Sequence, residues 1–446
     1  MKITVSKFGG SSMKDHEAMI RSAKISMERN ATITLVSATY GTTDQLHSLV
    51  DYAVEGNWNA CEKLLFTLRE KHFDILANLS NDQLVSENLR ELLNNLETLT
   101  RGIFLLSECS PKAMDRVVSF GERLSSILFK EALSSVWKTQ NVELFDSRKI
   151  LKTNSNFGKA KPNISRIKKE CSDKFNKDGK TAYVGQGYIG SDENDVTTTL
   201  GRGGSDYSAA LFAEGIQADV LEIWTDVAGI ATTDPRICKN TKAINEISYN
   251  EASEMAQYGA KILHPTTLVP AIRANIPVFV GSSYEKDEKG TWIKAVVEDR
   301  PLIRAIAKRN NQALLTITNP KMLNAFGFMG NIFDIFTKHQ VSVDCITTSE
   351  ISVAVSMDED TLKNKELVRD LQEVGQVVTE LGFSLVSLIG NQMLEHSGLG
   401  KRIFSSIENI NVRMLCLGAS AYNFNILVRQ SDSDKAIQNL HKEFIK

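Results

Sequence analysis

The sequence predicts an α/β layer around a largely parallel sheet, followed by two small α+β modules. Three observations lead to this prediction. Short apolar runs alternate with amphipathic helical stretches over about the first 290 residues, glycine clusters lead into two of the expected helices, and one order of elements occurs twice beyond about residue 300. Alternating strands and helices are typical of a parallel sheet covered by helices.

The first part of the chain supplies the strands and helices of this layer. Compact apolar runs, each bounded by Gly, Ser or charged residues, are the expected strands at residues 33–37, 181–184 and 277–280. Helical spacing of apolar positions predicts helices at residues 205–213 and 265–274. Residues 58–107 are rich in Leu, Glu, Asn and Lys with apolar positions three and four apart, which predicts a helical lobe rather than sheet.

Beyond about residue 300 the order strand, helix, strand, strand occurs twice. The first copy has its four elements at residues 314–318, 328–333, 341–343 and 351–355. The second copy has them at residues 385–389, 399–404, 410–412 and 424–428. The alternative is a chance likeness of two small α+β units, which the matching order of four elements disfavours. Two tandem β-α-β-β modules are therefore predicted.

A chain of 446 residues is expected to form two or three domains. The patterns predict a first domain at residues 1–292 that includes the helical lobe at 58–107. The two modules are predicted at residues 300–378 and 379–446, and the polar stretch 284–290 is an expected loop near the end of the α/β layer.

Charge and cysteine content exclude several classes of partner. Lys and Arg number 52 and Asp and Glu number 54, so the net charge is -2, and no basic field for nucleic acid is expected. The six cysteines are scattered, without a C-x-x-C pair or metal-ligand spacing to His, so reduced thiols and no protein-bound metal are expected. Because no signal peptide or membrane-length apolar run occurs, we expect a cytoplasmic protein without a membrane partner.

Two glycine-rich segments are the candidate anion sites. Residues 7–12 (KFGGSS) end the first expected strand, and residues 197–206 (TTTLGRGGSD) lead into an expected helix. Glycine lets backbone N–H groups approach an anion, and a helix N-terminus adds positive potential. A glycine pair after a strand is more often only a turn, and the first segment lacks the spacing of a Walker P-loop. The alternative for the second segment is a flexible loop, which would not need an arginine between its glycines. Together, two such segments suit a substrate with phosphates at one end and carboxylates at the other.

Seven segments resemble the motifs of the aspartokinase family and follow the family order. They are KFGGSS at 7–12, VSA at 36–38, SFGE at 119–122, the segment 197–206, WTDVAGIATTDPR at 224–236, GAKILHP at 259–265 and IPVFV at 276–280. One match can arise by chance, whereas seven in order cannot. The resemblance covers nearly the whole chain, is greatest to the single-function, lysine-sensitive branch, and leads us to expect no homoserine dehydrogenase extension.

The resemblance implies an α/β, amino-acid-kinase-like sandwich with a largely parallel central sheet, followed by two C-terminal α+β ACT (ferredoxin-like) modules. It implies an aspartate kinase that transfers the γ-phosphate of ATP to the β-carboxylate of L-aspartate, giving 4-phospho-L-aspartate. Mg²⁺ would accompany ATP. This reaction is the first step of lysine, threonine, methionine and diaminopimelate biosynthesis.

The resemblance also implies roles for single positions. Phosphoryl transfer is assigned to Lys7 and Asp206. Phosphate binding is assigned to Gly9, Gly10, Ser11, Gly203 and Gly204. Aspartate binding is assigned to Thr43, Glu122, Arg202 and Ser205, and nucleotide binding to Thr225, Asp226, Ala231, Arg236 and Lys261. Ala231 departs from the family, whose members usually have an aromatic residue there that contacts the nucleotide. For Asp206 the alternative is an acid that only stabilises a helix N-terminus.

These residue types suit the chemistry. A substrate carboxylate with a pKa of about 4 is already ionised at neutral pH, so it needs no general base. The reaction requires in-line positioning and neutralisation of charge on the phosphoryl group, which Lys7, glycine N–H groups and Mg²⁺ can provide. Arg202 can fork onto a substrate carboxylate, and Glu122 can accept hydrogen bonds from its ammonium.

By resemblance, the first module binds an effector, with L-lysine favoured. The implied positions are Met322, Ala325, Phe328, Met329, Val343, Asp344, Ser349 and Glu350. Asp344 and Glu350 suit an ammonium group. Residue type alone favours solvated strand and turn acids, and the match of residues 342–344 and 347–350 to the family favours the effector site instead. Ala325 and Met329 replace the serine and leucine of lysine-sensitive relatives. Small sheets have free edges, so we expect a homodimer through the ACT modules, with further pairing into a tetramer left open.

Two other functions compete with this interpretation. The first is a kinase of the same fold that acts on another acceptor, such as glutamate, N-acetylglutamate or a nucleoside monophosphate. The motif at 119–122 together with Arg202 argues against it. The second is a non-catalytic amino-acid sensor, which the intact Lys7, Arg202 and Asp206 disfavour.

Overall fold

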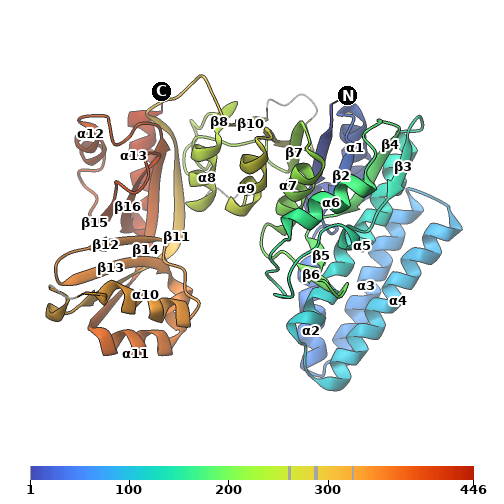
Figure 1. Cartoon of the computed structure of the whole chain (residues 1–446), viewed down its shortest axis with the longest axis horizontal. Helices are drawn as coiled ribbons and strands as arrows, with labels where there is room; N and C mark the ends of the chain where they lie inside the picture. The colour runs from blue at the N-terminus through green and yellow to red at the C-terminus, as the bar shows by residue number, and fades with distance from the viewer. Residues whose placement is uncertain (1, 260–262, 286–289, 324–325, 446) are drawn as a thin grey trace. The chain divides into compact units, whose positions relative to one another are not determined.

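The computed structural model describes residues 2–259, 263–285, 290–323 and 326–445 and divides into two compact units (Figure 1). The first unit comprises Met1–Ile230, Ala243–Tyr249 and Ile262–Val297. The second comprises Ala231–Lys242, Asn250–Lys261 and Glu298–Lys446. The predicted domain boundaries remain predictions, because two segments within residues 1–292 belong to the second unit.

An eight-stranded sheet with the order β3-β4-β2-β1-β7-β9-β10-β8 forms the centre of the first unit. Its strands are β1 (Thr4–Phe8), β2 (Ile33–Val36), β3 (Asn141–Leu144), β4 (Thr181–Gln186), β7 (Val220–Thr225), β8 (Glu246–Ser248), β9 (Val278–Ser282) and β10 (Thr291–Lys294). All neighbours pair in parallel except β9 and β10. This confirms the predicted, largely parallel sheet. In it Lys7 pairs with both Leu35 and Ile223, so the carboxyl ends of β1, β2 and β7 lie together.

Helices cover this sheet. They are α1 (His16–Glu28), α2 (Thr42–Val54), α5 (Pro111–Val136), α6 (Ile164–Lys174), α7 (Gly204–Ile216) and α9 (Pro265–Ala274), and α8 (Tyr249–Gln257) follows β8. A short antiparallel pair, β5 (Ile189–Ser191) and β6 (Thr197–Thr199), precedes α7. Helix α5 packs on α1 and on strands β2, β3 and β4, whereas α7 packs on β1, β7, α6 and α9.

The predicted helical lobe is confirmed. Its helices α3 (Trp58–Ala77) and α4 (Gln83–Leu106) pack on each other, on α2 and on α5 (Figure 1). Their buried leucines and isoleucines join one core with Phe8, Val36 and Phe129. Within the described residues, no helix combines the length and apolarity needed to cross a membrane.

The second unit contains one antiparallel sheet with the order β12-β13-β11-β14-β16-β15. The elements of the first repeat are β11 (Ile303–Thr318), α10 (Phe328–Lys338), β12 (Cys345–Thr348), β13 (Ser352–Asp358) and α11 (Lys365–Val374). Those of the second are β14 (Gln376–Gly390), α12 (Leu399–Ser406), β15 (Val412–Cys416), β16 (Asn423–Arg429) and α13 (Ser433–Phe444). The repeat is therefore present, and each copy ends with an additional helix.

The two modules share their long strands. Strand β11 pairs with β14 over its whole length, from Ile303 opposite Gly390 to Thr318 opposite Gln376. The first core takes Ala313, Leu315 and Ile317 from the second half of β11, whereas the second core takes Ile303 and Ile306 from its first half. Each module therefore uses half of each long strand. Cys238 from the segment Ala231–Lys242 also belongs to the second core, which explains why that segment groups with this unit.

One predicted strand is wrong in position. The strand expected to open at 341–343 begins at Cys345, because the preceding backbone closes the end of α10. The N–H of Val341 donates to the carbonyl oxygen of Phe336 at 2.9 Å, and Gln340 has φ +55°. The pairs Val343–Asp344 and Ser349–Glu350, expected on strands, consequently flank β12 instead of lying on it.

Candidate active site

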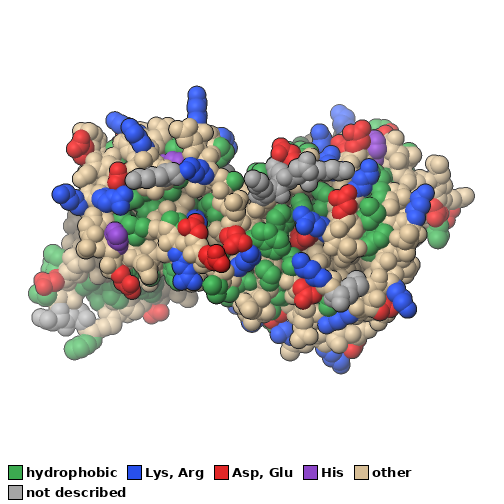
Figure 2. Space-filling view, turned by 90° about the horizontal axis from the view of Figure 1, so that it is seen from above, with side chains coloured by type: hydrophobic (Ala, Val, Ile, Leu, Met, Phe, Trp, Pro, Cys, Tyr) green, Lys and Arg blue, Asp and Glu red, His purple; other side chains and the backbone are tan. Residues whose placement is uncertain are grey.

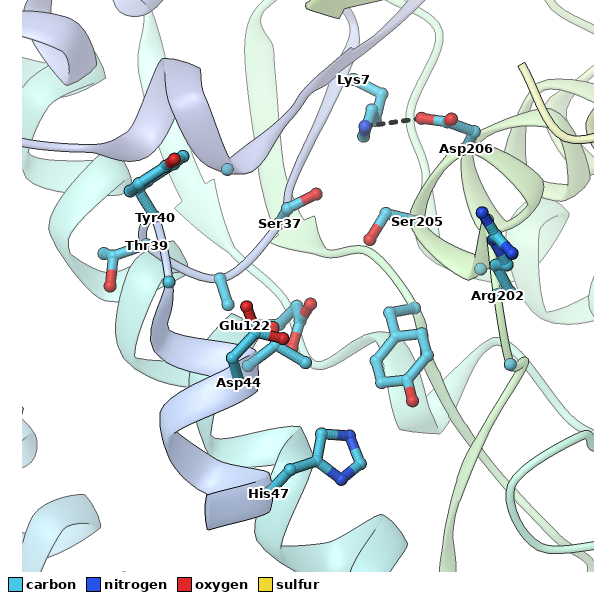
Figure 3. Close-up of a pocket in the computed structure, with 18 residues that line it drawn as sticks. Lys7, Ser37, Thr39, Tyr40, Asp44, His47, Glu122, Arg202, Ser205 and Asp206 are labelled. Carbon is cyan, nitrogen blue, oxygen red and sulfur yellow. Dashed lines mark ion pairs between the residues drawn. The ribbon is translucent and has the colours of Figure 1, made fainter. Parts of the chain in front are cut away.

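A cavity of about 530 Å³ lies where β1 and β2 end and α7 begins (Figure 3). Both glycine-rich segments line it. Of the predicted site residues, the structure brings together Lys7, Gly10, Thr43, Glu122, Arg202, Gly203, Gly204, Ser205 and Asp206. The two segments therefore line one cavity, and its use as a substrate site remains a prediction.

The first glycine segment is fixed at the end of β1. The N–H of Gly9 donates to the carbonyl oxygen of Trp224 on β7 at 3.1 Å, and residues Gly10–Met13 form a short 3-10 helix. A Cβ atom on Gly10 would lie 3.3 Å from the carbonyl oxygen of Ala38, so the backbones are close there. Asp15 then caps α1 by accepting from the N–H of Ala18 at 2.9 Å. Turn and cap together hold the segment against the cavity.

The second glycine segment turns sharply into α7. Gly201 and Gly203 have φ of +76° and +72°, a left-handed conformation that glycine adopts without strain. A Cβ atom on Gly203 would lie only 2.4 Å from Cβ of His264, so this position also requires glycine for space. The N-terminus of α7 at Gly204 thus meets the cavity with its positive dipole end, while the N–H of Gly204 itself donates to the carbonyl oxygen of Gly201 at 2.9 Å.

Lys7 and Asp206 form an ion pair at one end of the cavity (Figure 3). Lys7 Nζ lies 2.5 Å from Asp206 Oδ1, and Lys7 is 7% exposed. The two groups are in close charge contact, but Asp206 Oδ1 has no well-directed hydrogen bond to any residue that the structure describes. Asp206 therefore holds the ammonium group near the glycine segments and leaves its N–H bonds able to turn toward a ligand.

Glu122 is a buried carboxyl group with an unsatisfied oxygen. It is 3% exposed, and within the described residues its Oε2 atom has no hydrogen-bond partner. Burial raises the pKa of Glu122 to about 8, and the backbone N–H of Ala38 and the charge of Lys7 offset only part of that effect. Such a group is suited to accept a cation that enters the cavity.

The sequence analysis missed several lining residues. They are Ser37, Thr39, Tyr40, Gly41, Asp44, His47 and Tyr188. Most follow β2 or begin α2, so the rule that ligands bind beyond the carboxyl ends of parallel strands could have indicated them. The buried His72 is hydrogen-bonded through Nε2 to the Thr39 hydroxyl at 3.2 Å. The Thr39 hydroxyl oxygen lies 2.6 Å from the hydroxyl oxygen of Thr42. Burial lowers the pKa of His72 to about 4, so it supports this loop as a neutral side chain.

The predicted nucleotide positions are divided between the two units of the chain. Thr225 ends β7 next to the first glycine segment, Asp226 follows it, and the Thr225 hydroxyl donates to Asp226 Oδ1 at 3.0 Å. Ala231 and Arg236 belong to the second unit, where Arg236 is paired with Asp234. Lys261 lies outside the described residues.

The predicted effector positions lie around the first module. Met322, Phe328, Met329 and Val343 pack on its core. Asp344 Oδ1 accepts from Arg309 Nη1 at 2.8 Å, while its buried Oδ2 has no partner in the described chain. Ser349 and Glu350 are exposed, and Ala325 lies outside the described residues.

Comparison with known proteins identifies relatives of both parts of the chain. The amino acid kinase family matches residues 2–282, and an ACT domain matches residues 386–444. Lysine-sensitive aspartokinase 3 of Escherichia coli (strain K12) is 41% identical over 454 residues, covering 100% of both chains. Aspartokinase 1, chloroplastic, of Arabidopsis thaliana is 31% identical and covers 99% of this chain and 80% of its own length.

Two solved structures of E. coli aspartokinase III cover 100% of both chains at 41% identity. The complex with aspartate and ADP (R-state) superposes with a TM-score of 0.90. The complex with lysine and aspartate (T-state) superposes with a TM-score of 0.81.

Proposed function

The chain belongs to the amino acid kinase family and, within it, to the aspartokinases, and from this premise we propose that its cavity transfers the γ-phosphate of ATP to the β-carboxylate of L-aspartate. The observation that carries the proposal is one cavity that unites a Lys–Asp ion pair, two glycine segments, and a carboxyl and a guanidinium group suited to an amino acid. The product is 4-phospho-L-aspartate.

Aspartate is held by complementary charges. Glu122 accepts hydrogen bonds from the substrate ammonium, which supplies the cation that its buried carboxyl group lacks. Arg202 forks onto a substrate carboxylate, and the hydroxyls of Thr43 and Ser205 add neutral hydrogen bonds. With both ends of the amino acid fixed, the β-carboxylate faces the glycine segments and Lys7.

Phosphoryl transfer requires positioning and charge neutralisation, and the substrate carboxylate is itself the nucleophile. Lys7 neutralises charge on the transferring group, the N–H groups of the glycine segments bind phosphate oxygens, and Asp206 orients Lys7. Mg²⁺, when bound with ATP, neutralises charge on the phosphates. Mg²⁺ commonly binds through one or two carboxylates together with substrate phosphates. Asp206, one of three described carboxylates that line the cavity, would fit such a role because it lies beside Lys7.

The nucleotide is proposed to bind beside β7. Thr225 and Asp226 lie next to the first glycine segment and support this placement, and Ala231, Arg236 and Lys261 remain proposed contacts. The small Ala231 side chain offers no ring for stacking on the adenine.

The test of the acceptor is a comparison of kcat/KM for aspartate, glutamate and N-acetylglutamate with MgATP. We expect a preference for aspartate of at least about 10³-fold, since a site built for one spacing of charges leaves its buried polar groups unpaired with another. Preference for a different acceptor would overturn the assignment. Failure to form any aspartyl hydroxamate with hydroxylamine present would instead favour the amino-acid sensor.

We expect kcat/KM for aspartate to rise with pH up to about 8. Below that value the free enzyme holds Glu122 protonated, because burial raises its pKa to about 8, and only the carboxylate accepts the substrate ammonium fully. The measurement is a pH profile of kcat/KM at saturating MgATP.

In Glu122→Gln the rise should disappear, and the KM for aspartate should increase roughly 10- to 100-fold through loss of a charged hydrogen bond. A variant that retains the same pH profile would assign the titration to another group. An increase confined to the KM for ATP would remove Glu122 from the aspartate site.

Regulation by L-lysine is proposed for the first ACT module, as is a homodimer through these modules. Support comes from the E. coli structure that contains lysine and from Asp344, whose buried Oδ2 could accept from an ammonium. Leu323, Phe326 and Ile346 expose 52%, 103% and 38% of their surface in this module, which favours pairing with a second surface. A cytoplasmic location is proposed with it.

Glu350→Lys should raise the lysine concentration for half-inhibition at least tenfold, because a new positive charge repels the effector's ammonium. The uninhibited rate should stay unchanged. Glu373→Lys, an exposed acid on α11 of the same module, is the matched control and should respond to lysine as the wild type does. Unaltered lysine sensitivity of Glu350→Lys would place the effector elsewhere.

A further inference from the structure

A second cavity, of about 650 Å³, lies in the first unit between α4, α5 and the start of β6. Three arginines line it, Arg116 and Arg123 on α5 and Arg148 beyond β3. The residues of α5 that reach this cavity repeat three and four apart, so they form a different face of the helix from the one that carries Glu122. No role in the proposed reaction uses this cavity.

The guanidinium groups differ in how they are paired. Arg148 is satisfied, because its Nε and Nη2 atoms donate to Asp146 at 2.6 to 3.2 Å and its Nη1 donates to the Thr197 hydroxyl at 3.1 Å. Arg123 has no acceptor among the described residues and lies over the ring of Phe120 at 4.8 Å. Asp146 therefore has its oxygens committed to one arginine while a second remains unpaired beside it.

The electrostatics of the cavity favour an anion. Burial, and then the charges of Arg148 and Arg116, lower the pKa of Arg123 to about 10, with Asp146 opposing them in part. Of the described residues that line the cavity, Glu108 is the one carboxylate and it is exposed, while Asp146 beside the arginines is paired with Arg148. A half-buried cation without a carboxylate hydrogen-bonded to it is costly, and an entering anion would reduce that cost.

The shape and remaining walls narrow the class of ligand. Leu99, Ile103 and Phe120 form an apolar wall, while Asn95 and Thr98 add polar groups. A guanidinium fork matches the two oxygens of a carboxylate or phosphate. We propose that this cavity binds a small anionic metabolite, whose carboxylate or phosphate engages Arg123 and Arg116 and whose apolar body packs on the wall formed by Leu99, Ile103 and Phe120.

The cavity connects to the proposed aspartate site through two elements. Arg148 bonds Thr197, which opens the segment 197–206 that carries Arg202 and Asp206. Asp115 of α5 accepts from the N–H and hydroxyl of Thr199 at 2.9 and 2.8 Å. An anion that binds Arg123 or Arg148 would therefore shift the segment that carries the residues proposed to hold aspartate. This coupling, unlike the binding itself, rests on the proposed function.

Binding is tested on the full chain by titration calorimetry at fixed ionic strength, with aspartate and MgADP saturating so that the first cavity is filled. The probes are benzoate, succinate and inorganic phosphate, with neutral benzamide as the control. We expect at least one anion to bind with a Kd in the low millimolar range or below, and benzamide not to bind. Comparison of the three distinguishes a carboxylate with an apolar body from a dicarboxylate and from a phosphate.

Two variants locate the binding. Arg123→Gln removes the unpaired charge and should weaken the anion at least tenfold. Gly102→Phe fills the cavity and should abolish binding, because Gly102 lines it and a Cβ there would meet nothing within 4 Å. Arg90→Gln is the matched control, since Arg90 also lies over a ring, that of Phe73 at 5.6 Å, but lines no part of this cavity, and it should bind as the wild type does.

Equal affinity of wild type, Arg123→Gln and Gly102→Phe for every probe would overturn the proposal. The proposal would also be overturned by a pair of results: the wild type binds no anion, and light scattering shows that Gly102→Phe changes the oligomeric state. The exposed Leu105 and Leu106 at the cavity would then mark a protein interface. Binding that leaves the KM for aspartate unchanged would keep the site and remove its coupling. An inactive enzyme that still binds the anion would instead count against the proposed function alone.

Discussion

Lys7→Met is expected to lower kcat by about 10²- to 10³-fold while the KM for aspartate stays within a few-fold of wild type. Lys7 is the full positive charge that the first glycine segment brings to the cavity, and it is held there by Asp206 at 2.5 Å. Removing one preorganised donor from a developing negative charge typically costs about 3 to 4 kcal/mol, which corresponds to that factor. Aspartate contacts Glu122 and Arg202 in this arrangement, so its binding should change little.

Methionine is chosen because Lys7 is almost fully buried, and an unbranched apolar side chain keeps the packing of the lysine stem. The fold should therefore persist, as judged by the thermal midpoint. Lys14→Met is the matched control, because Lys14 is an exposed lysine just after the same glycine segment, and it should retain the wild-type rate.

Asp206→Asn tests the partner of this lysine. If Asp206 only stabilises the N-terminus of α7, the amide should lower the thermal midpoint slightly and leave kcat unchanged. If it orients Lys7, kcat should fall by at least tenfold.

A Lys7→Met enzyme with a near wild-type rate would remove Lys7 from the mechanism and with it the central step proposed above.

The sequence was sufficient for the fold class because the patterns were local. Compact apolar runs and helical spacing correspond to β2, β4, β9, α7 and α9, and the helical lobe follows from leucines three and four apart. The prediction of a strand opening at 341–343 was wrong because the strand preference of these residues is a weaker local signal. Valines there favour a strand, yet the backbone of Val341 is used to close α10.

The candidate site was predictable in part for a different reason. Residue type alone indicates Lys7, Arg202 and the glycines as site residues. The pairing of β2 with β1 is what brings Thr39, Tyr40 and His47 to the cavity, and the sequence does not show that pairing. No sequence pattern predicts the arginine-lined cavity, because Arg123 is left without a hydrogen-bonded carboxylate only when Asp146 pairs with Arg148. Burial and pairing of this kind are tertiary properties.

Gly203→Ala is expected to lower kcat/KM for aspartate by about 10²-fold. The left-handed backbone at φ +72° costs a non-glycine residue roughly 1 to 2 kcal/mol, and the new methyl group would lie 2.4 Å from Cβ of His264. The turn must therefore shift, and it carries Arg202 on one side and Ser205 on the other. Displacing a positioning group by about 1 Å is enough for a loss of this size.

The matched control separates strain from displacement. Gly56→Ala places the same side chain at φ +75° between α2 and α3 with nothing within 4 Å, so it should lower the thermal midpoint without changing kcat/KM. The clash involves Cβ of His264, so only His264→Gly, and not His264→Ala, should restore part of the activity of Gly203→Ala. Gly203→Ala could instead behave like Gly56→Ala in both the thermal midpoint and kcat/KM. The close approach of Gly203 to His264 would then have no effect on the positions of Arg202 and Ser205. In that case the second glycine segment provides a turn and not a closely fitted wall of the active site.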